Sequence, residues 1–284
     1  MSVRQAGVGF LGGTVAVVPG MGRAHVAEQG FVLLLPTDAY IAAGVATVAL
    51  TVLVLALLPP KAATGLFRPV FSVPTLPDAV GATLRPVTAG VLLFVIIAGV
   101  IGSTDPLANP LPLMIWVVWW MGLVAVQGGL FDLWRGVSPW LYVPKRAPFR
   151  LPVRLGYLPA IIGFLALSAF ILADPAPADP RRLATLLVAY LTITALGLVL
   201  FGRRWLLQCE AVTVLMQSYR RIAPFARQGG SVGCGLWGWR TAAAGRPPLG
   251  LAVLSVLILG SVSYDGVKET FWWLGLLGVN PLEY

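Results

Sequence analysis

Charged residues are scarce in this sequence. Asp, Glu, Lys and Arg make up 11% of its 284 residues and hydrophobic residues make up 58%, whereas a soluble domain has about 25% charged residues. So few charges cannot cover the surface of a water-soluble protein of this length, and the hydrophobic content excludes a disordered chain. The composition therefore predicts an all-α, polytopic transmembrane helix bundle.

Residues that carry metal, redox or nucleophile chemistry are also scarce. The sequence contains one histidine, His25, and two cysteines, Cys209 and Cys234. Two cysteines exclude a disulfide-rich scaffold, and a single histidine excludes haem ligation by paired histidines within a bundle. A P-loop, an HExxH motif and a CxxC motif are absent from the sequence as well. The chain therefore offers little of the chemistry of common enzyme classes.

Long apolar runs are what the sequence does contain. A spanning helix needs about 20 mainly apolar residues to cross the hydrocarbon core of a bilayer. Six uncharged runs meet this requirement, at residues 39–59, 86–104, 111–131, 155–173, 183–202 and 248–264. We expect each run to form one membrane span, within a single transmembrane domain over residues 25–284.

The basic residues alternate between the loops that join these spans. In chain order, the five loops and the C-terminal tail hold 3, 0, 5, 2, 7 and 1 Lys or Arg residues. Loops 61–85, 132–154 and 203–246 hold 15 of the 20, and cytoplasmic loops are rich in these residues. The distribution predicts a bacterial inner-membrane protein with both mature termini outside. The basic cytoplasmic loops also account for the net charge of +9. We therefore expect the lipid bilayer to be the partner, and we expect no binding to nucleic acid.

The N-terminus resembles a secretory signal peptide. An uncharged stretch follows Arg4, and the predicted cleavage site lies after Ala24, so residues 1–24 would be removed; an uncleaved helix is the alternative. Cleavage makes His25 the first residue, where its amine and imidazole together suit copper or another divalent metal. The alternative for His25 is a solvent-exposed terminal residue with no ligand.

One segment is predicted to lie on the membrane surface. Residues 204–224 place Leu207, Val214 and other apolar side chains on one helical face, with arginines at the ends. This pattern predicts an amphipathic helix on the cytoplasmic leaflet. The glycine-rich stretch 229–235 that follows is expected to be a flexible loop.

Tryptophans mark two further segments. Residues 270–282 are apolar but too short to span, so we expect them to lie in the interface or to pack on a partner. Trp116, Trp119 and Trp120 recur at helical spacing in the third predicted span. They predict a packing or interface belt rather than a ligand cage.

Asp132 is a candidate catalytic residue because it follows the third predicted span directly. An acid at bilayer depth is costly and marks a functional site. The alternative is a structural pair with Arg135, three residues on, that ends the helix. Glu210 is expected to be a solvated residue on the polar face of the 204–224 helix.

Asp265 is the second candidate catalytic residue. It lies at the outer end of the last predicted span, in the sequence Tyr-Asp-Gly. Together with Asp174, Asp179 and Glu269 it would form an acidic cluster that holds a hard cation through oxygen ligands. The alternative is that short outer loops simply tolerate acidic residues.

Several short segments occur together in a recognisable order. They are 25–29 (HVAEQ), 35–37 (LPT), 138–140 (SPW), 155–157 (LGY), 179–181 (DPR), 200–202 (LFG), 223–224 (AP) and 264–266 (YDG). This order resembles a family of polytopic bacterial and archaeal membrane proteins commonly labelled fenitrothion hydrolase. The resemblance covers the chain from about residue 25 and matches the first part of the family only, since its members usually continue with further spans.

The family label implies organophosphate ester hydrolysis at a metal that activates water, with only carboxylates and His25 to hold it. The resemblance implies that the unmatched part of the family either forms a separate subunit or is absent. A bundle that lacks this part would expose a helix face to a partner. Gly90, Gly99 and Gly102 in the second predicted span permit close helix contact.

We therefore expect first a non-catalytic or accessory subunit of a larger membrane assembly, bound to another membrane protein. A membrane-bound organophosphate-type hydrolase is the alternative that the family label implies. Copper handling at the periplasmic face through His25 is the second alternative.

Overall fold

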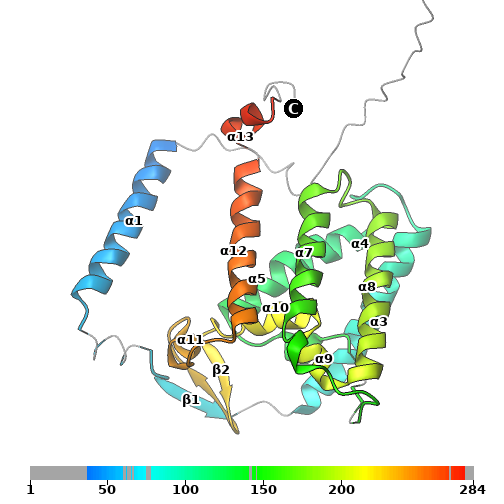
Figure 1. Ribbon diagram of the computed structural model, residues 1–284, viewed down its shortest axis with the longest axis horizontal. Coiled ribbons are helices and arrows are strands. Elements are labelled where there is room, and N and C mark those ends of the chain that lie inside the picture. Colours follow the sequence, from blue (N-terminus) through cyan, green and yellow to red (C-terminus); the bar gives the residue numbers. More distant parts are fainter. Residues whose placement is uncertain are drawn as a thin grey trace, which may run out of the picture.

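The structure is a computed structural model that describes residues 37–59, 62, 65, 67–74, 78–140, 143–144, 146–268 and 270–278 (Figure 1). Four helices in this part of the chain are long and apolar enough to cross a membrane: Gly81–Ile101, Pro110–Gly129, Pro180–Phe201 and Leu249–Lys268. Two shorter apolar stretches, Asp38–Val54 and Leu158–Ala173, accompany them. The prediction of a mostly helical chain with membrane-type helices is confirmed. The predicted signal peptide 1–24 and His25 lie outside the described residues.

The described elements are helices and one small sheet. In chain order they are α1 (Thr37–Leu57), β1 (Phe71–Pro74), α3 (Asp78–Ile101), α4 (Pro110–Pro112), α5 (Val124–Gly129), α6 (Trp134–Val137), α7 (Leu158–Ala173), α8 (Pro180–Phe201), α9 (Arg203–Gln208), α10 (Ala211–Tyr219), β2 (Phe225–Gln228), β3 (Ser231–Cys234), α11 (Trp239–Ala243), α12 (Leu249–Lys268) and α13 (Phe271–Leu276). A π-helical segment (Leu113–Leu123) joins α4 to α5, and a 3₁₀ turn (Val153–Leu155) precedes α7.

Each predicted span coincides with helical structure, but two differ from the expectation. The sequence predicts that the second begins at Pro86, whereas α3 begins at Asp78 and contains Pro86 within the helix. Proline lacks an N–H donor and usually lies at a helix start, which is why the pattern suggested a boundary there. The third, predicted over 111–131, consists of α4, the π-helical segment and α5 in succession.

Asn109 fixes the connection between α3 and α4. Its side chain is fully buried, and its Oδ1 accepts a hydrogen bond from the backbone N–H of Leu111 at 3.0 Å. Its Nδ2 donates to the carbonyls of Ala98 and Ser103 at 2.9 and 2.7 Å. The amide therefore caps the new helix and satisfies carbonyls at the end of the previous one.

Three clusters of buried apolar side chains hold the helices together. The first contains Ala160, Phe164, Val214, Leu215, Leu251 and Leu254, the second Val95, Leu111, Ile115, Leu183 and Ala184, and the third Trp134, Val212 and Met216. Trp120 packs on the first cluster, Trp116 on the second and Trp119 on the third. The tryptophans of the π-helical segment thus serve packing, one of the two roles that their spacing predicts.

Glycines allow close approach at several places, two of which involve α8. At Gly99 in α3, an added Cβ would lie 3.2 Å from the Cβ of Ala184 in α8. At Gly197 in α8, an added Cβ would overlap the indole ring of Trp205 in α9. The contact predicted for the small residues of the second span is therefore made within this chain at Gly99, whereas a Cβ at Gly90 meets nothing within 4 Å.

A three-stranded antiparallel sheet lies at one end of the helices (Figure 1), in the order β1-β3-β2. Cys234 of β3 pairs with Phe71 of β1 on one side and with Phe225 of β2 on the other. The turn between β2 and β3 contains Gly229 at a φ of 59°, a conformation that favours glycine. The prediction of a flexible loop over 229–235 is therefore wrong, because strand β3 pairs with neighbours on both sides.

The sheet joins loops that the charge pattern assigns to one side of the membrane. Strand β1 comes from loop 61–85, and β2 and β3 come from loop 203–246. Phe131, directly before loop 132–154, forms a parallel bridge to Phe225. The three loops that are richest in Lys and Arg therefore lie together.

The prediction of one surface helix over 204–224 is also wrong. The segment forms α9, a break at Cys209 and Glu210, and then α10. All six residues over 211–216 are buried, because α10 packs against α5 and α7. The apolar face that the pattern assigns to lipid instead contacts the protein core.

Helix α1 stands apart from the other helices (Figure 1). Its described side chains from residue 38 to residue 57 are all exposed. The Thr47 and Thr51 hydroxyls donate to the carbonyls of Ala43 and Thr47 at 2.8 and 2.7 Å. Both threonine hydroxyls therefore have acceptors within the helix, as an apolar environment requires.

Candidate functional site

A buried amide organises the polar cluster that follows α5. Gln127 is fully buried, and its Nε2 donates to Asp132 Oδ1 at 2.9 Å and to the Met216 carbonyl at 3.0 Å. Its Oε1 accepts from the backbone N–H of Trp134 at 2.8 Å. These hydrogen bonds join α5, α6 and α10. The bond to Oδ1 also fixes the orientation of the Asp132 carboxylate.

Asp132 forms an ion pair with Arg220, at the end of α10. Arg220 Nη1 lies 3.1 Å from Asp132 Oδ2, and the two side chains are 36% and 27% exposed. The pattern of the sequence named Arg135 as partner and gave no sign of Arg220, which lies in a different loop. Gln127 therefore contacts one oxygen of Asp132 and Arg220 the other.

Positive charge predominates around Asp132. Burial, followed by the charge of Arg220, lowers the pKa of Arg240, while Asp132 acts in the opposite direction. Arg221 adds a further positive charge. The Nε of Arg220 is buried without a hydrogen-bond partner in the described part of the chain. Asp132 therefore serves as counter-ion to more than one guanidinium group.

Glu210 is the most buried acid of the described residues. Only 2% of it is exposed, and its carboxylate accepts from the backbone N–H groups of Val212 at 3.0 Å and Thr213 at 2.6 Å, capping α10. Burial raises the pKa of Glu210 to about 7, against the opposing hydrogen bonds from Thr213 and Val212. The prediction of a solvated residue is wrong because the helix breaks here and turns Glu210 inward.

The described outer acids, Asp174, Asp179 and Asp265, do not gather into a cation site. Asp265 Oδ1 lies 3.3 Å from Lys268 Nζ, and Asp174 Oδ2 lies 2.7 Å from Arg182 Nη2. Asp179 caps α8, and Glu269 lies outside the described residues. Within the described ranges, no three His, Cys, Asp or Glu side chains lie close enough to hold a metal ion.

The two candidate catalytic acids are far apart. Asp132 lies beside the sheet, whereas Asp265 lies near the other end of α12 (Figure 1). Sixteen residues of helix separate Leu249, at the sheet end, from Asp265, which corresponds to about 24 Å. The structure therefore does not bring them into one site.

The sequence contains a Gly-x-Ser-x-Gly pattern at 229–233. In hydrolases this pattern places the serine on a sharp turn from a strand into a helix. Here Ser231 begins β3 in a hairpin, and its hydroxyl donates to the Gln228 carbonyl at 3.1 Å. The local structure is therefore that of a hairpin rather than a nucleophile elbow.

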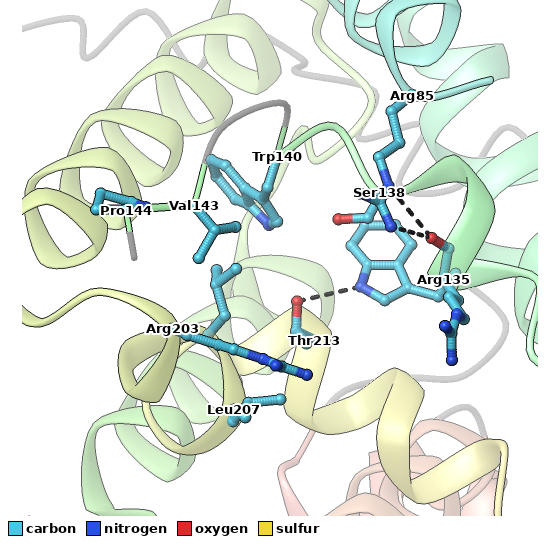
Figure 2. A pocket seen from close by; sticks show the side chains of 11 residues that line it. Arg85, Arg135, Ser138, Trp140, Val143, Pro144, Arg203, Leu207 and Thr213 are labelled. Atoms are coloured by element: carbon cyan, nitrogen blue, oxygen red, sulfur yellow. Dashed lines mark hydrogen bonds between the residues drawn. The ribbon is translucent and has the colours of Figure 1, made fainter. Parts of the chain in front are cut away.

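A cavity of about 580 Å³ opens beside the polar cluster (Figure 2). It is lined by Arg85, Trp134, Arg135, Ser138, Trp140, Val143, Pro144, Arg203, Leu206, Leu207 and Thr213. Three of these residues are arginines and none is acidic. Sequence reasoning missed the cavity because its walls come from α3, α6, the segment after α6, α9 and α10, which are distant in the chain.

Comparison with models of protein families, with curated proteins and with solved structures found no match.

Proposed function

We propose that this protein is a multi-pass protein of the bacterial inner membrane that serves as a non-catalytic or accessory subunit of a larger membrane assembly. The six apolar helices act as spans, with α1 and α7 joining the four longer ones. The observation that carries this proposal is helix α1, which is exposed along its described length and stands apart from the rest of the chain.

The surface of α1 favours a helix partner in addition to lipid. Ala43, Thr47 and Thr51 follow one another at intervals of four residues and so lie on one face. Small and hydroxyl side chains let transmembrane helices approach closely. A Cβ at the nearby Gly44 also meets nothing within 4 Å, so this part of α1 has room for another backbone.

The proposed orientation places the sheet in the cytoplasm and the mature termini outside. The three loops with most Lys and Arg meet at the sheet, which supports a common side for them. Single cysteines at Leu107 and Val153, both exposed, test the orientation. In a background lacking Cys234, an impermeant maleimide should label Leu107→Cys in intact spheroplasts and Val153→Cys only after lysis. The reverse pattern would overturn the orientation.

Photo-crosslinking on α1 tests the association. A photoreactive residue at Thr47 should crosslink to a second protein in membranes, whereas one at Val45, about 160° around the helix, should contact lipid. Native mass spectrometry of the gently solubilised protein should then show a complex with a different chain. A lone monomer, with equal crosslinking from both positions, would contradict the proposal.

Catalysis is tested separately from association. Purified protein is incubated with a chromogenic organophosphate and added divalent metals, and we expect no turnover. Turnover that is lost in Asp132→Ala or Asp265→Ala would favour the hydrolase and overturn the non-catalytic role. N-terminal sequencing tests the copper alternative, since an intact Met1 removes the amine chelate at His25.

A further inference from the structure

The cavity beside α6 has the chemistry of an anion site. Arg85, Arg135 and Arg203 line it, and no Asp or Glu is among its lining residues. The Glu210 carboxylate accepts a hydrogen bond from the backbone N–H of Thr213 in α10, but Glu210 does not line the cavity. A cavity lining that includes arginines and no acidic residue attracts negatively charged groups.

Arg85 is held in a fixed orientation at the cavity. Its Nε and Nη2 donate to the backbone carbonyl of Arg135 at 3.3 and 3.0 Å (Figure 2). A guanidinium group has five N–H donors, so three remain for a ligand. A fixed, planar group with unused donors suits the oxygens of a phosphate, which arginine binds in a bidentate manner.

Trp140 supplies a second observation that points to a ligand. Its indole Nε1 is buried and has no hydrogen-bond partner among the described residues. Figure 2 shows this nitrogen on the side of the ring that faces Ser138 and Thr213, within the cavity. A buried donor without an acceptor is costly, and an anionic oxygen in the cavity would satisfy it.

Apolar side chains lie beside the arginines of the cavity. Arg203, Leu206 and Leu207 of α9 form one wall, so a cation and aliphatic side chains lie side by side. Basic pockets between membrane helices bind phospholipid headgroups in this way. We propose that the cavity binds a phosphate group, carried by an anionic phospholipid or by a soluble phosphate ester.

Arg203 and Arg204 provide a matched pair of variants for the test. They are consecutive and both exposed at the start of α9, but only Arg203 lines the cavity. The delipidated full-length protein in detergent is titrated with phosphatidylglycerol, phosphatidylcholine or inorganic phosphate, and its thermal unfolding is followed. Arg203→Gln should weaken the response to the phosphate-bearing anion about tenfold, the effect of one charge-assisted hydrogen bond. Arg204→Gln should respond as the wild type does.

Trp140→Phe gives an independent readout. Without ligand its stability should change little, because removal of the buried, unpartnered N–H offsets the loss of the five-membered part of the indole ring. The variant should bind the phosphate-bearing anion several-fold more weakly than the wild type does. A loss of binding without a matching loss of stability is not expected from a merely structural tryptophan.

The outcomes separate the two sources of phosphate. A response to phosphatidylglycerol and not to phosphatidylcholine supports a lipid headgroup, and a response to inorganic phosphate alone supports a soluble ester. An absent response to both anions overturns the site. So do equal effects of the Arg203 and Arg204 variants.

Discussion

Arg220 Nη1 lies 3.1 Å from Asp132 Oδ2, and this ion pair joins the segment after α5 to the end of α10. It is one of several contacts through which the three basic loops meet. Because Gln127 holds the other oxygen of Asp132, the pair belongs to a polar cluster that links three helices.

The Asp132–Arg220 pair should contribute measurably to stability. We expect Asp132→Asn and Arg220→Met each to lower the free energy of unfolding by about 1–3 kcal/mol, since each leaves a half-buried group without its partner. The double variant should lose less than the sum of the two, by about 1 kcal/mol. Unfolding in mixed detergent micelles measures all three.

Asp265→Asn is the control for that pair. Asp265 is 55% exposed where it meets Lys268, so its replacement should change stability by less than about 0.5 kcal/mol. If the effects of the Asp132 and Arg220 variants on unfolding free energy are strictly additive in the double variant, the ion pair does not contribute to stability.

Gln127→Leu should be among the most destabilising single changes. It leaves the Trp134 N–H, the Met216 carbonyl and an Asp132 oxygen without their partner, at a cost of about 2–4 kcal/mol in unfolding free energy. Gln217→Leu is the matched control, because Gln217 Nε2 is buried without a partner among the residues that the structure describes, and its removal should be neutral or stabilising. Equal effects of the two variants would refute the role given to Gln127.

Glu210 should make stability depend on pH. Its ordinary pKa of 4.5 rises to about 7 in the folded state, so the folded protein binds this proton more tightly. Its stabilising contribution is complete below pH 4.5 and is lost as the pH rises towards 7. The expected fall in unfolding free energy across that range is about 3 kcal/mol.

Glu210→Gln should flatten this profile, and melting temperatures at pH 5 and pH 7.5 give the comparison. Asn109→Ala removes an uncharged buried cap and should lower stability equally at both pH values. If the slope between the two pH values persists in Glu210→Gln, another group is responsible.

Gly197→Ala should destabilise the contact between α8 and α9. The added methyl group overlaps the ring of Trp205, and overpacking of this kind costs about 1–3 kcal/mol. Gly90→Ala adds the same group to α3 in open space, where the better helix propensity of alanine makes it neutral or stabilising. Tryptophan fluorescence during thermal unfolding distinguishes the two, and a neutral Gly197→Ala would show that Trp205 moves freely.

The long apolar helices were predictable from the sequence because most of each is an uncharged apolar run, a signal that needs no knowledge of neighbours. The sheet was not, because its strands have four residues each and pair across distant loops. The prediction of a surface helix over 204–224 failed for a related reason. An amphipathic pattern fits burial against protein as well as against lipid, and the break before α10 contains neither glycine nor proline.

The candidate site was likewise predictable only in part. Asp132 was identified from its depth alone, but its partners Gln127 and Arg220 depend on how α5 and α10 pack. Glu210 was placed on the wrong face because its role as a helix cap becomes visible only once the helix start is known. The arginine cavity has no local pattern at all, since five separate segments form its walls.

The sheet also sets an order of events for the newly made chain. Strand β1 leaves the ribosome before α3, yet its partner β3 is made only after α10. Until then the exposed edge of β1 has no strand to pair with, so the layer where the basic loops meet cannot close while the middle helices are being inserted. A chain interrupted anywhere before Ser231 would carry its first hydrophobic helices into the membrane with this layer permanently open.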